Sequence, residues 1–196
     1  MKEAVPLAAS SFRSVFLPGF GKKRIAGVDY DLDHLDPFTM EVKAKEEDAS
    51  PYIVRVSFGF HCFTREITPE DSPDLHMVHG KEKRCFCHHR YKLSKELADM
   101  IRYAAAGRAY FGDKGNFLIV EMPDQGNAPY VAFFDVEKAK KADGYDGAMF
   151  VTSAHLRPKL PNKLPAVSFV TVVDYRIKGR DLKRPPPRNV VAQKRK

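Results

Sequence analysis

Hydrophobic residues make up 43% and charged residues 30% of the 196-residue chain, proportions typical of a globular protein that buries a core without disulfides or a metal ion. The net charge of +8 comes entirely from residues 176–196, because 24 basic and 24 acidic residues remain in the rest of the chain, so total charge alone does not indicate nucleic-acid binding. An apolar patch at residues 5–9 is too short for a signal-peptide core or a membrane span, and three cysteines are an odd count, so we expect a cytoplasmic protein that does not contact membranes.

The first clear element is a strand over residues 53–65, preceded by a second candidate strand at 38–44. Its residues alternate between an apolar set and a polar set, as the two faces of a strand require. The apolar set is Val54, Val56, Phe58, Phe60 and Cys62, and the polar set is Arg55, Ser57, His61 and Arg65. We therefore expect Cys62 in the core and His61 on a solvated face beside two arginines.

A polar segment at residues 66–83 follows and is predicted to be a long loop. All three cysteines and five of the seven histidines lie between His61 and His89, where metal binding is one interpretation. The candidate zinc ligands are His76, His79, Cys85 and Cys87. A single residue separates the two cysteines, whereas structural zinc sites usually place two to four there, so we predict no cofactor and keep zinc as an alternative.

One helix is predicted over residues 94–106, with Ser94 as its N-cap and apolar residues at helical spacing. His89 and Arg90 stand just before it, where a helix N-terminus favours a bound phosphate. Strands are predicted at 108–111, 116–122, 129–137, 148–156 and 166–175, separated by turn sequences. The expected fold class is α+β, with a mainly antiparallel sheet, one principal helix on one face and the other face open for binding.

In the predicted strand at 148–156, every second residue from Met149 onward should lie on one face. This set contains Met149, Val151, Ser153 and His155, and Arg157 joins it if the strand continues. A hydroxyl, an imidazole and a guanidinium would then follow one another at steps of roughly 6.5–7 Å. This set suits phosphate binding or phosphodiester cleavage, since RNA cleavage needs a base, an acid and a positive charge. The same residues are also compatible with the solvated end of an ordinary strand.

Residues 176–196 contain nine basic residues and the run Pro185–Pro187, and we predict a flexible basic tail after a single domain of residues 1–175. Such a tail attracts polyanions without reading their sequence. A tail that only improves solubility would have the same composition, so both interpretations stay open.

Over residues 84–175, a predicted helix is followed by a predicted antiparallel sheet whose last strands carry polar residues. This arrangement resembles the RelE, barnase and EndoU type of small ribonuclease domain. The resemblance implies a location for function, namely basic and imidazole side chains on the exposed sheet face. Nothing else is carried over from the resemblance. Among partners we expect nucleic acid, with RNA favoured, and a protein partner or inhibitor.

Two hypotheses follow. In the first, the protein is a cytoplasmic protein that acts on nucleic acid, and its specific form is a metal-independent endoribonuclease of toxin or defence type. Its candidate catalytic residues are His61, Arg65, His89, Arg90, Ser153, His155 and Arg157. In the second, it is a non-catalytic accessory module that binds nucleic acid or protein, with or without a structural zinc. The first requires that the three segments carrying these side chains converge in space.

Overall fold

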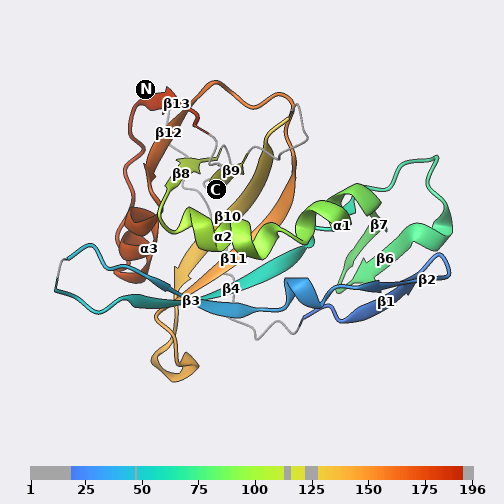
Figure 1. The fold of residues 1–196 in the computed structure, drawn as a ribbon, viewed down its shortest axis with the longest axis horizontal. Coiled ribbons are helices and arrows are strands. Elements are labelled where there is room, and N and C mark those ends of the chain that lie inside the picture. Colours follow the sequence, from blue (N-terminus) through green and yellow to red (C-terminus); the bar gives the residue numbers. More distant parts are fainter. Residues whose placement is uncertain (1–18, 47, 113–115, 122–127, 192–196) are drawn as a thin grey trace, which may run out of the picture.

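The computed structural model describes residues 19–46, 48–112, 116–121 and 128–191, and its main feature is a large sheet of eight strands (Figure 1). In spatial order the strands are β13 (Pro187–Asn189), β12 (Lys163–Ser168), β8 (Arg108–Phe111), β9 (Phe117–Glu121), β10 (Tyr130–Lys138), β11 (Gly147–Leu156), β4 (Tyr52–His61) and β3 (Phe38–Val42). Neighbouring strands pair antiparallel except β11 and β4, which run parallel. The predicted features at residues 5–9, 113–115, 124–127 and 192–196 lie outside the described residues.

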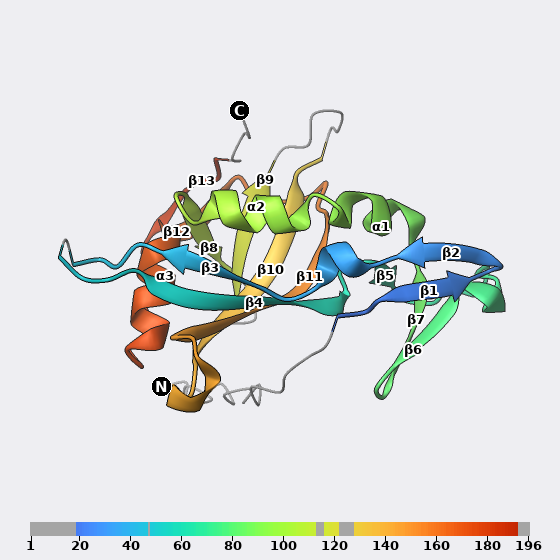
Figure 2. The ribbon, with the colours of Figure 1, turned by 60° about the horizontal axis from the view of Figure 1, so that its bottom comes forward.

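Two smaller sheets lie at one end of the molecule, beside the end of β4, while the last helix lies at the opposite end (Figures 1 and 2). One is a hairpin of β1 (Lys22–Ile25) and β2 (Val28–Asp31). The other contains β5 (Thr64–Arg65), β7 (Glu82–Phe86) and β6 (His76–His79), in that order. Short 3₁₀ helices, η1 (Asp33–Leu35), η2 (Pro73–Leu75) and η3 (Lys141–Asp143), occur in the connections. The predicted loop at residues 66–83 is therefore wrong in part, because it contains η2, β6 and the start of β7.

The predicted fold class is wrong. Strands make up 44% of the described residues and helices 20%, and three α-helices replace the single one expected: α1 (His88–Ser94), α2 (Leu97–Ala104) and α3 (Phe169–Ile177). The predicted helix at 94–106 is in fact the end of α1 followed by α2, with a break at Lys95 and Glu96. The sheet is also mixed, because it contains a parallel pair.

The predicted strand at 166–175 is mostly α3, for a reason that the sequence contains. Its β-branched residues favour a strand, but Phe169, Val172, Val173 and Ile177 are buried at spacings of three, four and eight residues, which place them on one face of a helix. Ser168 caps this helix by accepting a hydrogen bond from the Thr171 backbone N–H at 3.1 Å. Tertiary packing and capping here outweigh the local strand preference.

The main core lies between α2, α3 and one face of the large sheet. The predicted alternation is confirmed in β4 and at Cys62, which directly follows it, since the side chains of the apolar set are at most 5% exposed. They join Met149 and Val151 of β11 and Met100 of α2 in one buried cluster. Burying side chains of this size contributes roughly 1.5–3 kcal/mol each, so this face dominates the stability of the fold.

A β-bulge in β11 changes which face its side chains occupy. Phe134 pairs with Val151 but Phe133 pairs with Ser153, so Thr152 is the additional residue in β11. Met149 and Val151 point into the main core, whereas Ser153 and His155 point to the opposite face. The prediction that all four share one face is wrong, because a bulge shifts the two-residue period by one position.

The second face of the sheet carries a smaller apolar cluster of Tyr110, Leu118, Val120, Val131 and Leu164, with Phe133 at its border. Leu164 belongs to β12, and β13, which falls within the predicted tail, pairs with β12. The hydroxyl of Tyr110 donates to the Val191 carbonyl at 3.0 Å and accepts from its N–H at 2.8 Å. In the described part of the chain, no helix has the length and apolar character needed to cross a membrane.

Candidate functional site

The parallel strands β4 and β11 bring three of the predicted residues to one place. Ser153 is the register partner of His61, so these two side chains share the second face of the sheet. His155 follows Ser153 by two residues and lies on the same face. From the rise of a strand and the spacing between strands, the Cα atoms of His61 and His155 are roughly 8 Å apart, a distance that one phosphate group with its sugar can span.

His155 is the most perturbed imidazole of the described residues. Its ring stacks on Phe133 with centroids 5.5 Å apart and an interplanar angle of 22°. Its Nδ1 atom is buried and has no hydrogen-bond partner in the described structure. Burial first, and then the positive charges of Arg90 and Arg157, lower the pKa of His155 to about 4. The imidazole is therefore neutral at pH 7.

Arg90 of α1 is held at the end of β4. Its Nη1 donates to the backbone carbonyls of His61 at 3.1 Å and of Thr64 at 2.7 Å. Burial lowers the pKa of Arg90 from its ordinary value, but a guanidinium stays charged at neutral pH. The contacts of α1 with the strand end thus place a fixed positive charge close to His155.

Arg157 supplies a second positive charge close to the same imidazole. Its guanidinium carbon lies 5.4 Å from the centroid of the Phe133 ring, a cation–π contact, and its backbone N–H donates to the Pro129 carbonyl at 2.9 Å. We call Arg90, Phe133, His155 and Arg157 the His155 site. His155 and Arg157 both contact the Phe133 ring, and the charge of Arg90 acts on His155, so these groups suit an anion attached to an organic group.

His61 is oriented by an acid from the small sheet. Its Nε2 lies 2.8 Å from Glu82 Oε2, and both side chains are partly exposed. A carboxylate bonded to one ring nitrogen fixes the orientation of a histidine and leaves the other nitrogen for a ligand.

Comparison with known proteins identifies the family. Residues 22–176, from β1 to α3, match the family model described as the YjaZ family. The chain belongs to the YjaZ family. It is 27% identical over 165 residues to Protein YjaZ of Escherichia coli strain K12, an alignment that covers 79% of this chain and 88% of that protein. No solved structure matches the chain.

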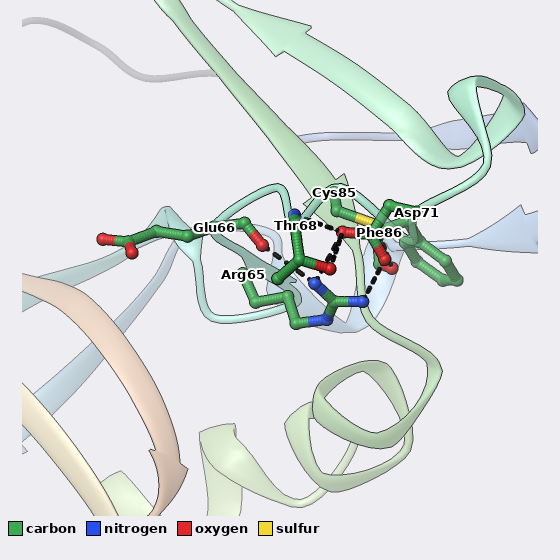
Figure 3. Close-up of polar contacts among 6 residues, drawn as sticks. All are labelled: Arg65, Glu66, Thr68, Asp71, Cys85 and Phe86. Carbon is green, nitrogen blue, oxygen red and sulfur yellow. Dashed lines mark hydrogen bonds and ion pairs between the residues drawn. The ribbon is translucent and has the colours of Figure 1, made fainter.

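Two of the seven predicted site residues of this YjaZ-family chain lie apart from the His155 site. Arg65 makes two parallel hydrogen bonds to the carboxylate of Asp71, and its Nη1 also donates to the Glu66 carbonyl at 2.9 Å (Figure 3). The Arg65 guanidinium, with the Thr68 backbone N–H, holds the pKa of Asp71 well below its usual range. Arg65 therefore fastens the segment after β5. His89 is exposed on α1.

The structure does not bring the four candidate zinc ligands of the YjaZ-family chain together. His76 and His79 are three residues apart in β6, so they point to opposite faces. His76 lies opposite Cys85 in β7, whereas the His79 ring packs on Phe20 and Phe60. Within the described residues no three His, Cys, Asp or Glu side chains are close enough to hold one metal ion.

Sequence reasoning missed Phe133 and Glu82. Phe133 belongs to an apolar run, which indicates core, and only its position opposite Ser153 shows that it borders a polar site. Glu82 belongs to the segment predicted as a loop, and only the packing of the small sheet beside β4 brings it to His61. The sequence around each residue gave little indication of its role, because that role depends on a contact with a residue far away in the chain.

Proposed function

We propose that this protein is a cytoplasmic RNA-binding protein that holds a phosphodiester at the His155 site. The observation that supports this most is the environment of His155, a neutral imidazole whose pKa is lowered by burial and by the guanidinium groups of Arg90 and Arg157. Both cations act on the same neutral imidazole, so an anion bound beside it would be attracted by two positive charges. Arginine is the side chain best shaped to bind phosphate oxygens in pairs.

The choice of RNA over DNA rests on the imidazole. A neutral imidazole has one N–H donor and one acceptor nitrogen, so His155 can donate to a phosphate oxygen or accept from a 2′-hydroxyl. DNA lacks that hydroxyl, which is the group that distinguishes the two polymers for a protein. We therefore expect tighter binding to single-stranded RNA than to DNA of the same sequence.

Cleavage of the bound RNA is a second candidate function, and the pairing of His61 with Glu82 near His155 favours it. In the proposed reaction, His155 takes the proton of a 2′-hydroxyl, whose oxygen forms a bond to phosphorus. The bond from phosphorus to the 5′-oxygen breaks, and His61 gives that oxygen a proton. The charge of a bound phosphate would raise the pKa of His155 from about 4 toward neutrality, as a base requires.

The test incubates EDTA-treated protein with labelled single-stranded RNA and DNA and measures both binding and cleavage. Wild-type protein is compared with Arg157→Gln and with the double variant His61→Ala/His155→Ala, and His89→Ala serves as the control. Binding that weakens in Arg157→Gln but not in His89→Ala supports the binding proposal. Cleavage lost only in the double variant supports catalysis. Equal RNA affinity in all four proteins would refute the binding proposal, and cleavage that the double variant retains would refute catalysis.

A further inference from the structure

A cavity opens on the second face of the sheet next to the His155 site. Its volume is about 430 Å³, and its walls come from β9, from the segment after β11 and from β13. Val120, Leu160 and Val190 with three prolines form the apolar part, and Asn162 and Asn189 contribute the amides. A cavity of this size lies within the range of small-molecule sites, about 300–1,000 Å³.

The cavity adjoins the His155 site at Arg157. Pro158, which lines the cavity, follows Arg157 in the chain, and Pro129, which also lines it, accepts the hydrogen bond of the Arg157 N–H at 2.9 Å. Arg157 therefore stands at the border between them. A ligand with an anionic group at Arg157 would direct its adjoining group toward the cavity.

The border of the cavity is basic. Lys159, Lys163 and Arg188 are exposed, and each adjoins a lining residue in the sequence. Residues 156–164 and 187–191, which carry most of the lining, contain no acid. An anionic ligand is therefore attracted to the side of the cavity that these two segments form.

From this arrangement we infer that the cavity is a nucleobase pocket, and that its preferred occupant is the adenine of a nucleotide whose phosphate binds Arg157. This inference rests on the proposed function and adds a specificity to it. Apolar side chains and proline rings cover the faces of a base, while an asparagine amide pairs with N6 and N7 of adenine through one donor and one acceptor. The protein should therefore prefer adenine-containing RNA.

The experiment measures the affinity of fluorescent 12-nucleotide oligo(A), oligo(U) and oligo(C) for wild-type protein and four variants. Leu160→Trp fills the cavity, Asn162→Ala removes an amide, Arg157→Gln removes the phosphate contact, and Ile67→Trp, at an exposed position in the connection after β5, is the control. We expect wild-type protein to prefer oligo(A), and Leu160→Trp and Asn162→Ala to lose about tenfold in oligo(A) affinity. Ile67→Trp should bind like wild type.

The same experiment separates the two proposals. If Arg157→Gln weakens binding while Leu160→Trp and Asn162→Ala bind all three oligonucleotides like wild type, the RNA-binding proposal stands and the pocket inference is wrong. Adenosine, which has no phosphate, is titrated into ¹⁵N-labelled protein as a second measurement, and shifts of the Asn162 and Asn189 side-chain amides support the pocket even if RNA does not bind. Unchanged amide signals with adenosine, or shifts caused only by a proline-rich peptide, would overturn the inference.

Discussion

At the scale of single residues, the structure gives each candidate histidine a different environment, which the sequence alone does not show. His61 is oriented by Glu82, His79 packs among phenylalanines, and His89 is exposed. His155 differs because its ring stacks on Phe133 and its pKa is lowered by burial and by two guanidinium groups. A perturbed pKa beside charged groups is a general indication of a functional site, and for His155 it coincides with the geometry of the strand ends.

The environment of His155 predicts how stability depends on pH. In the unfolded chain this imidazole takes up a proton as the pH falls below its ordinary pKa of 6.5, whereas in the native state it stays neutral down to about 4. Its contribution is therefore fully present above pH 6.5 and is lost as the pH falls toward 4. After allowance for solvent screening, we expect this loss to be about 1–2 kcal/mol of unfolding free energy.

Urea unfolding between pH 7 and pH 4.5 measures this effect. Compared with wild type, His155→Gln should lose less stability over this range, because glutamine has no proton to gain. His89→Gln at an exposed position should follow the wild-type curve. Parallel curves for wild type and His155→Gln would show that the imidazole titrates normally in the native state.

At the scale of elements, the bulge in β11 is the feature that places the site. It turns Ser153 and His155 from the core face to the second face, and the neighbouring strand accommodates it at Gly59. A Cβ atom at Gly59 would lie 2.7 Å from the Thr152 carbonyl oxygen and 3.0 Å from the Phe150 ring. A glycine is thus required here by the close approach of the bulged backbone.

We predict that Gly59→Ala destabilises the protein by about 1–3 kcal/mol, because the added methyl group forces β4 and β11 apart. Urea unfolding measures the loss, and amide chemical shifts of Ser153 and His155 report whether the bulge moves. Ser57→Ala, at a partly exposed position on the same face of β4, is the control and should change little. An unaltered midpoint for Gly59→Ala would mean that the bulge adjusts without strain.

The start of α3 provides a second prediction at this scale. Ser168 accepts a hydrogen bond from the Thr171 N–H, whereas Ser72 precedes η2 without a side-chain capping bond. Ser168→Ala should therefore lower the unfolding free energy by about 0.5–2 kcal/mol, and Ser72→Ala should have no comparable effect. Thermal or urea unfolding of both variants tests this, and equal effects of the two substitutions would contradict the assignment of the cap.

At the scale of the whole molecule, the question is whether RNA binds to the sheet or to the basic C-terminal segment. Lys183 and Arg184 are exposed in that segment, whereas Arg157 lies at the site. If RNA binds mainly at the His155 site, Arg157→Gln should weaken RNA affinity and reduce the slope of log affinity against log salt concentration by about one. The double variant Lys183→Gln/Arg184→Gln should then reduce RNA affinity less than Arg157→Gln does. The reverse order of effects would assign binding to the C-terminal segment.

The sequence by itself determined what depends on neighbours along the chain. The alternation of β4, the burial of Cys62 and the apolar spacing within α2 are local periodicities, and the structure confirms them. The clustering of imidazole and guanidinium groups in three segments was likewise visible before any fold was known.

Only the tertiary structure decided how these segments meet. The parallel pairing of β4 with β11, the extra residue at Thr152 and the docking of Arg90 on the end of β4 all depend on contacts between distant parts of the chain. A strand sequence does not encode its partner or its register, and one inserted residue reverses every side chain beyond it. For this reason the sequence named His155 as a candidate, but only the fold placed it on the same face as His61.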